Sequence, residues 1–396
     1  MKNFVFVSPN FPETYWRFCR GLKDNGFNVL GIGDAPYYEL SEPLKKSLTE
    51  YYKVSSLENY DEVFRAVAFF TFRYGKIDWL ESNNEYWLER DAALRTEFNI
   101  QTGFQNKDMP KVKFKSKMKA YFKKVGIKVA KHCMASTLPV CKRLINQVGY
   151  PVIVKPDNGV GANATYKINN EQELRQFLKN KLDIPYIMEE YIEGEVNSYD
   201  AIVNSKGEPI FETGNVTPYS LMDIVNNSGD SVFYIVNSPF DDVRAAGRKV
   251  LKAFGVKSRF VHFEFFRLTK DQRIGKKGDI VALEVNMRPS GGISPDMMNF
   301  ANSTDVYKIW ADMVAFDSTL KDCGERYYCV FVGRREGKSY KYCEQDIVYK
   351  YGANIKFLGK VAKALSGAMG DIMFVANFKE KADMDAFVAD VIAPQE

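Results

Sequence analysis

The stretch Ile280-Val281-Ala282-Leu283-Glu284-Val285-Asn286-Met287-Arg288-Pro289 decides the fold. Side chains alternate between the two faces of a strand, so Glu284, Asn286 and Arg288 point the same way. The rest of the segment is apolar, and carboxylates buried without a metal or a partner are costly. The pattern therefore predicts a strand with a functional polar face rather than a face turned to solvent.

A second predicted strand supplies another carboxylate. Residues 261–266 alternate in the same manner and carry Glu264 on one face. A hairpin closing near residues 270–279 would bring Glu264 beside Glu284 and Asn286. Two carboxylates and an amide oxygen make a hard, all-oxygen site suited to Mg²⁺ shared between protein and phosphates.

Arg288 and His262 flank these predicted ligands. Arg288, next along the same face, is placed to neutralise a transferring phosphoryl group. We expect His262 to be structural and to point to the face opposite Glu264. The chain has only two histidines, His132 and His262, which nearly excludes His-rich metal sites and multi-histidine catalysis.

A glycine-containing loop follows another apolar strand. Residues 150–156 form a buried strand in which Lys155 is the last side chain before Pro156, and the loop 157–163 contains Gly159 and Gly161. Such a loop between antiparallel strands can fold over a polyphosphate and offer its amides as donors, while the lysine supplies an ammonium. An ordinary glycine turn stays the alternative.

The predicted strand that begins at Tyr186 runs into a carboxylate-rich segment, Glu189 to Glu195. Acids at a strand end can accept hydrogen bonds from an exocyclic amine or from ribose hydroxyls. On these residues alone, a charged turn is the simpler interpretation.

The first hundred residues alternate between strand and helix patterns, which predicts a small parallel α/β layer. Strands are expected at 4–7, 27–32 and 77–80, and helices at 15–22, 60–74 and 84–98. Gly31-Ile32-Gly33 begins like a dinucleotide fingerprint, but Pro36 stands where the third glycine is needed. These glycines are therefore interpreted as turn residues.

Composition indicates a soluble globular protein. The chain has 396 residues, 45% hydrophobic and 27% charged, which predicts about two or three domains. A net charge of +5 is too mild to imply nucleic acid or a membrane as a partner. Residues 107–131 contain ten lysines, which favours a solvated helix face, with a nucleic-acid patch as the alternative.

The cysteines and the N-terminus predict a cytoplasmic protein. The six cysteines are scattered, and no apolar stretch resembles a secretory signal or a membrane span. We expect reduced thiols, and a homodimer stays open.

Taken in order, these motifs resemble the ATP-grasp superfamily, and within it the ADP-forming carboxylate–amine ligases of the L-amino-acid-ligase type. The resemblance covers nearly the whole chain. It implies a fold of mixed α/β and α+β character, the ATP-grasp fold with an N-terminal Rossmann-like domain. The implied divisions are an N-terminal α/β domain in 1–105, a small lid subdomain in 106–190, and a large subdomain with the magnesium site and a mixed C-terminal part in 191–396.

The resemblance also implies residue roles toward ATP. The residues implied to bind the nucleotide are Lys117, Lys155, Gly159, Gly161, Glu189, Glu190, Tyr191, Ile192 and Glu195. The two lysines would contact phosphates, with Lys115 a rival for Lys117, and the glycine loop would cover them. Glu189 would accept from the adenine amine, the backbone of 190–192 would reach the ring edge, and Glu195 would hold the ribose. Ala162 and Asn163 depart from a loop that often carries serine.

The same resemblance implies that Glu264, Glu284 and Asn286 bind Mg²⁺, with Mn²⁺ as an alternative ion. Arg288 would stabilise an acyl phosphate, and Arg288 and Lys155 are the implied catalytic residues. The implied reaction activates a carboxylate with ATP and passes it to an amine, with small molecules, amino acids among them, as substrates.

Three readings stay open at this point. The first is the carboxylate–amine ligase, and the second is an ATP-binding regulatory or scaffold protein whose chemistry has decayed. The third is a ligase acting on bicarbonate or a nucleotide precursor. Glu212 and the segment 216–228 are expected near the amine substrate.

Overall fold

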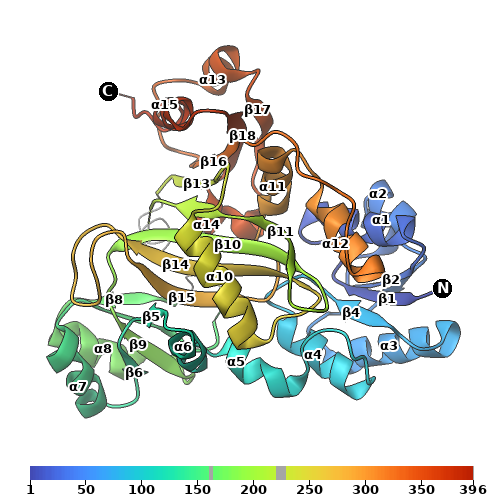
Figure 1. Cartoon of the computed structure of the whole chain (residues 1–396), viewed down its shortest axis with the longest axis horizontal. Helices are drawn as coiled ribbons and strands as arrows, with labels where there is room; N and C mark the ends of the chain where they lie inside the picture. Colours follow the sequence, from blue (N-terminus) through green and yellow to red (C-terminus); the bar gives the residue numbers. More distant parts are fainter. Residues whose placement is uncertain (160–163, 220–228, 396) are drawn as a thin grey trace.

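The chain forms three β-sheets in the computed structural model, which describes residues 1–159, 164–219 and 229–395. Figure 1 shows the N-terminal sheet in blue, a small green sheet at the opposite side, and a long central sheet that continues into the red C-terminal part. The polar strand pair predicted from the sequence lies in the central sheet.

The N-terminal sheet has four parallel strands in the order β3-β2-β1-β4. Its strands are β1 (Asn3–Val7), β2 (Asn28–Gly33), β3 (Glu50–Lys53) and β4 (Trp79–Glu81). The helices in this part are η1 (Glu13–Tyr15), α1 (Trp16–Asp24), η2 (Tyr37–Glu39), α2 (Glu42–Ser47), α3 (Tyr60–Tyr74) and α4 (Leu88–Glu97). The predicted parallel α/β layer is confirmed, although β3 and α2 were not foreseen.

The small sheet is antiparallel, in the order β6-β9-β7-β8. Its elements are β6 (His132–Met134), α7 (Leu138–Val148), β7 (Val152–Pro156), β8 (Tyr166–Ile168), α8 (Glu171–Asn180) and β9 (Tyr186–Glu190). One face packs on α7 and α8 through Val152, Val154 and Met188. Because side chains alternate, Lys155 and Glu189 lie on the other face.

The long sheet runs in the order β17-β18-β16-β13-β12-β10-β14-β15-β5, with β11 paired to β10. Its strands are β5 (Lys128–Val129), β10 (Gly194–Val203), β11 (Pro209–Thr213), β12 (Asn215–Thr217), β13 (Ser231–Ile235), β14 (Arg259–Leu268), β15 (Ile280–Asn286), β16 (Tyr328–Arg334), β17 (Ile355–Lys360) and β18 (Ile372–Phe378). The remaining helices are η3 (Asn106–Asp108), α5 (Met109–Lys113), α6 (Lys115–Lys124), α10 (Asp241–Phe254), α11 (Ser294–Asn302), α12 (Val306–Phe316), α13 (Glu344–Tyr351), α14 (Lys363–Met369) and α15 (Lys381–Val391).

Helix α10 lies across one face of β10 and β14, as Figure 1 shows in yellow. The approach is close at Gly247, where a Cβ atom would stand 2.2 Å from the ring of Tyr199. A side chain at Gly247 would therefore push the helix off the sheet. The polar residues of β10 and β14 that form the site lie on the opposite face of these two strands.

A buried group of charges joins the N-terminal sheet to the long sheet. Glu81 at the end of β4 pairs with Arg259 at the start of β14, and lies 3.4 Å from Arg95 of α4. Arg259 also donates from Nη1 to the carbonyl of Met287 at 2.6 Å, next to Arg288. Burial alone would raise the pKa of Glu81, but Arg259 and Arg95 lower it. Removing one partner from such a group leaves an uncompensated buried charge.

Asp91 of α4 lies beside these charges and is fully buried. Its Oδ2 accepts from the backbone N–H and the hydroxyl of Ser82 at 2.9 and 2.6 Å. Burial and the charge of Glu81 raise the pKa of Asp91 to about 7. The folded state thus keeps a proton that the unfolded chain loses near pH ~4, so stability falls as pH rises through that window.

We expect Asp91→Asn to flatten this pH dependence, because an amide has no proton to lose. Between about pH 4 and 7 the parent chain should lose on the order of a few kcal/mol of unfolding free energy that the variant keeps. Urea denaturation across that range measures the difference, with Asp61→Asn at an exposed site as the control. Parallel pH profiles for parent and Asp91→Asn would contradict the assignment.

No helix in residues 1–159, 164–219 and 229–395 is long and apolar enough to cross a membrane. The division at residues 105 and 190 stays a prediction. Strand β5 falls within the predicted lid range yet pairs with β15 of the long sheet.

Candidate functional site

The predicted hairpin forms, and its register creates a polar face. Glu264 lies opposite Glu284, and the neighbouring pair on the same face is His262 opposite Asn286. The register shifts after Glu264, so that Leu283 is an extra residue on β15. Bulges of this kind often stand beside active sites, where they redirect a side chain or a carbonyl.

Strand β10 extends this face by two residues that the sequence analysis missed. Ser198 pairs with Glu264, and Asp200 pairs with His262. Both are buried, Asp200 completely. The signal was present in part, because Asp200 stands between Tyr199 and Ala201 as Glu284 and Asn286 stand between apolar residues, whereas Ser198 follows the polar Asn197.

The prediction that His262 points away from Glu264 is wrong. Residues two apart on a strand share a face, and His262 Nε2 lies 3.1 Å from Glu264 Oε1, while its Nδ1 lies 2.8 Å from Asp200 Oδ1. Burial alone would lower the pKa of His262, but Asp200 and Glu264 raise it to about 10. The imidazolium therefore offsets part of the negative charge on this face.

Three lysines lie opposite the carboxylates. Lys155 comes from β7 of the small sheet, and Lys115 and Lys119 come from α6. Lys119 and Lys155 each place Nζ 2.6 Å from a different oxygen of Glu189. Lys115 places Nζ 3.3 Å from Glu284 Oε2. The lysines thus bring a carboxylate of the small sheet and a carboxylate of the long sheet into one charged cluster.

The lysines hold both carboxylates ionised. Burial would raise the pKa of Glu189, but Lys119 and Lys155 keep it well below its usual range. Burial would likewise raise the pKa of Glu284, but Lys115 and Lys155 lower it to about 2. Both groups are therefore anionic at neutral pH.

Lys117, which was predicted to contact phosphate, does not join the cluster. It is exposed on α6, whereas Lys115 and Lys119 are buried. Residues four apart share a helix face and residues two apart do not, so the face carrying Lys115 and Lys119 excludes Lys117. The rival, Lys115, occupies the place expected of Lys117.

We expect Lys115→Met to weaken ATP binding or turnover much more than Lys117→Met. Loss of one desolvated charge-assisted contact costs about 2 kcal/mol, or roughly thirtyfold. Loss of an exposed lysine should stay within about twofold. Nucleotide titrations and phosphate-release rates measure both variants. An equal or larger effect of Lys117→Met would restore the original assignment.

Helix α6 is tied to the glycine loop at its first turn. Asp157 accepts from the backbone N–H and the hydroxyl of Ser116, both at 2.7 Å, while Lys115 Nζ donates to the Gly159 carbonyl at 2.9 Å. The loop therefore begins against the lysine that reaches Glu284. Gly161, with Ala162 and Asn163, lies outside the described residues.

Arg288 is held at the edge of the polar face. Its Nη1 donates to the Pro289 carbonyl at 2.8 Å, and its Nε lies 3.7 Å from Glu85 Oε2. Glu85 also accepts from Lys113 Nζ at 2.9 Å. Glu85 follows β4 in a polar run at the carboxyl edge of the parallel sheet, the usual location for site residues. Its position directly after a strand of the parallel sheet is the sequence signal that could have identified Glu85 as a site residue.

The segment after β9 is held by its own partners. Glu190 receives the guanidinium of Arg273, with Nε to Oε1 at 2.8 Å, and its backbone N–H donates to the Lys131 carbonyl at 2.8 Å. Lys167 lies over the ring of Tyr191 at 4.3 Å. Ile192 is buried in a small apolar cluster.

Two predicted residues lie on the other face of the long sheet. Strand alternation puts Glu195 on the face opposite Ser198. Glu212 accepts from Tyr199 at 2.5 Å and from Arg248 of α10 at 2.9 Å. Glu212 thus does not lie on the face of Glu264 and Glu284, because its register opposite Ala201 turns it toward α10. That Glu212 lies near the amine substrate stays a prediction.

The donor set fits a hard cation that also binds phosphate. Glu264, Glu284 and Asn286 offer oxygens from one sheet face. Within the described residues, no group of three His, Cys, Asp or Glu side chains is arranged to hold a metal ion alone. An ion here would complete its shell with phosphate oxygens and water, as Mg²⁺ commonly does.

Residues 148–296, which include the glycine loop and both strands of the hairpin, match the family model of the ATP-grasp domain. The carbamoyl phosphate synthase large chain of Caldanaerobacter subterraneus subsp. tengcongensis is 24% identical over 217 residues, which is 53% of this chain and 19% of that protein. The chain thus aligns with about a fifth of the length of this curated relative.

Two solved structures match over nearly the full length. The ADP complex of N5-carboxyaminoimidazole ribonucleotide synthetase superimposes with a TM-score of 0.71 at 12% identity, covering 98% of this chain and 95% of the other. The L-amino acid ligase from Bacillus licheniformis gives 0.70 at 13% identity, covering 100% and 99%. At these identities the likeness concerns the fold.

Proposed function

We propose that this chain, which has the ATP-grasp fold, is an ADP-forming ligase that joins a carboxylate to an amine through an acyl phosphate. The observation that carries the proposal is the charged cluster between the small sheet and the long sheet. It combines the oxygen donors Glu264, Glu284 and Asn286 with the cations Lys115, Lys155 and Arg288 in one place. Anionic phosphates and a carboxylate are the groups that such a cluster would receive.

In the proposed reaction, a carboxylate oxygen attacks the γ-phosphorus of ATP. The bond between that phosphorus and the β–γ bridging oxygen breaks, and ADP leaves. The amine nitrogen then attacks the acyl carbon, the C–O bond to phosphate breaks, and the amine gives up a proton as the amide forms. Positioning and neutralisation of charge are the protein's contribution to such transfers.

Each side chain has a definite part in this proposal. Lys115 and Lys155 would exchange their carboxylate partners for phosphate oxygens, and Arg288 would face the charge that develops on the transferring group. Mg²⁺, held by Glu264, Glu284 and Asn286, would neutralise phosphate charge. Glu189 would orient Lys119 and Lys155, which modifies the expectation that its carboxylate is free for the adenine amine.

The nucleotide base is proposed to lie along the backbone that follows β9. The carbonyl of Glu190 and the N–H of Ile192 would meet the ring edge, while the Glu190 side chain is already engaged by Arg273. Glu195 is the proposed ribose partner, although it lies on the sheet face opposite Ser198 in this structure. A cytoplasmic location and a homodimer stay predictions.

The test is phosphate release from ATP with pairs of carboxylates and amines, amino acids first. Release that requires both partners, with a product containing the new amide, supports the proposal. ATP binding without turnover over the whole panel would favour the decayed regulatory protein. Release with bicarbonate or a nucleotide precursor in place of an amino acid would keep the fold and change the substrate.

A further inference from the structure

Asp200 and His262 are buried groups of the polar face to which the proposed reaction assigns no part. His262 stands between two carboxylates, with Nδ1 2.8 Å from Asp200 Oδ1 and Nε2 3.1 Å from Glu264 Oε1. An ionised carboxylate only accepts hydrogen bonds, so both ring nitrogens donate. The ring therefore joins an acid that is completely buried to one that is partly exposed.

The acid behind His262 is itself held in place. Ser198 donates its hydroxyl to Asp200 Oδ2, and the backbone N–H of Asn215 donates to the same hydroxyl at 3.0 Å. The hydrogen bonds thus run without a break from the backbone of β12, through β10, to Glu264 on β14. Because both nitrogens of His262 are engaged, the ring is held in one orientation.

The last bond of this chain determines how Glu264 is presented. Its Oε1 accepts from His262, whereas in the part of the chain that the structure describes no hydrogen bond or ion pair engages Oε2. The Glu264 side chain is 24% exposed, so an ion can reach it. Glu284, opposite on β15, carries the same charge and cannot hold the Glu264 carboxylate in place.

We infer that Asp200 and His262 are positioning residues for the ion, because they hold Oε1 of Glu264 and thereby reserve Oε2 for Mg²⁺. The inference rests on the proposed function, since only that function calls for an ion at this carboxylate. Metal-binding side chains are commonly oriented by such outer partners, whose removal typically costs about tenfold to a hundredfold in metal affinity. The alternative is that His262 only offsets negative charge.

The experiment is calorimetric titration of the full chain with ADP, once with saturating Mg²⁺ and once with EDTA. The ratio of the two dissociation constants measures how much more tightly the protein–ADP complex holds the ion than ADP in solution does. Neither constant depends on turnover. We expect Mg²⁺ to tighten ADP binding by the parent chain, since Glu264, Glu284 and Asn286 would add ligands to the ion.

The first variant carries Asp200→Asn together with His262→Leu. It removes one negative and one positive charge, so the net charge of the face is unchanged and no buried charge loses its partner. We expect the Mg²⁺-dependent gain in ADP affinity to fall by about tenfold to a hundredfold, with little change of the ADP affinity in EDTA. An unchanged gain would overturn the inference.

The single variant His262→Leu separates positioning from charge. It leaves the face one unit more negative, which strengthens cation binding if His262 only offsets charge. Loss of positioning weakens cation binding instead, so we expect the Mg²⁺-dependent gain to fall in this variant too. A larger gain than in the parent chain would count against a positioning role.

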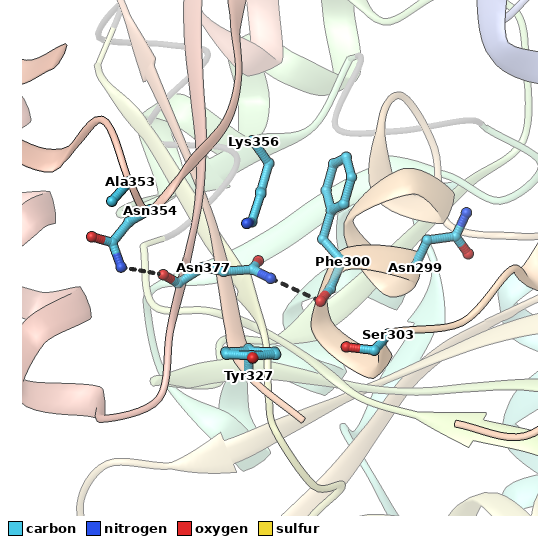
Figure 2. A pocket seen from close by; sticks show the side chains of 8 residues that line it. All are labelled: Asn299, Phe300, Ser303, Tyr327, Ala353, Asn354, Lys356 and Asn377. Carbon is cyan, nitrogen blue, oxygen red and sulfur yellow. Dashed lines mark hydrogen bonds between the residues drawn. The ribbon is translucent and has the colours of Figure 1, made fainter. Parts of the chain in front are cut away.

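Asn354→Ala is the control for a general loss of stability. Figure 2 shows Asn354 and Asn377 on the wall of another pocket, where Asn354 Nδ2 donates to the Asn377 carbonyl at 2.9 Å. Asn377 lies on β18, which β16, β13, β12 and β10 separate from β14 in the long sheet. The control thus removes a hydrogen bond of the fold away from Glu264 and should leave the Mg²⁺-dependent gain unchanged.

The parent chain distinguishes failure of this inference from failure of the proposed function. A parent that binds ADP no more tightly with Mg²⁺ than with EDTA would remove the ion site, and this inference with it. A parent that shows the gain, beside a double variant that keeps all of it, would overturn only the role of Asp200 and His262 and leave the phosphate-release test untouched.

Discussion

Glu284→Gln should reduce phosphate release by about three orders of magnitude or more. Glu284 stands at the centre of the polar face, opposite Glu264 in register and 3.3 Å from Lys115. The amide keeps the shape but loses the charge that would hold Mg²⁺. Metal stabilisation of transferred phosphate is worth several kcal/mol, and each 1.4 kcal/mol is about tenfold in rate.

The measurement is single-turnover phosphate release at saturating ATP, with circular dichroism to compare the folds. Glu336→Gln, at a side chain that is 63% exposed, is the matched control and should leave the rate unchanged. Raising the Mg²⁺ concentration should partly restore the variant if ion affinity is what it lost. A fully active Glu284→Gln would remove the metal assignment.

Arg288→Lys should lower kcat by roughly a hundredfold to a thousandfold, with little change in the KM for ATP. Loss of one fixed donor to developing charge typically has this size. Lysine keeps the charge but lacks the fork through which Arg288 reaches the Pro289 carbonyl and stands near Glu85. The effect should therefore fall on the chemical step.

Steady-state kinetics separates the two parameters for this variant. Arg267→Lys is the control, since Arg267 makes a paired contact with Asp242 at 2.8 Å and lies outside the charged cluster. A large rise in the KM for ATP with kcat unchanged would move Arg288 from the chemistry to nucleotide binding.

Much of the fold was predictable because its signals are local. The alternation at residues 280–289 and 261–266 predicted a hairpin, and Glu264 does lie opposite Glu284. The helix predicted at residues 60–74 is α3, which has those bounds. The match of residues 148–296 to the ATP-grasp domain, together with the whole-chain likeness to two solved structures, confirms the predicted fold.

The site was less predictable where partners come from distant segments. Which lysine faces inward depends on how α6 is rotated about its axis, and that rotation is set by packing against the long sheet. The pairing of Glu189 with Lys119 joins residues on separate elements, so no spacing in the sequence indicates it. His262 is different, because strand alternation alone was sufficient to place it beside Glu264.

The bond from Arg259 to Glu81 bears on how this protein can be recombined with others. Arg259 belongs to the long sheet, yet its charge is balanced by a carboxylate of the N-terminal layer, and its second bond holds the backbone beside Arg288. If the N-terminal layer were replaced by one without an acid at the position of Glu81, the buried guanidinium of Arg259 would lose its counter-charge. The two parts are therefore not interchangeable modules, and they must change together.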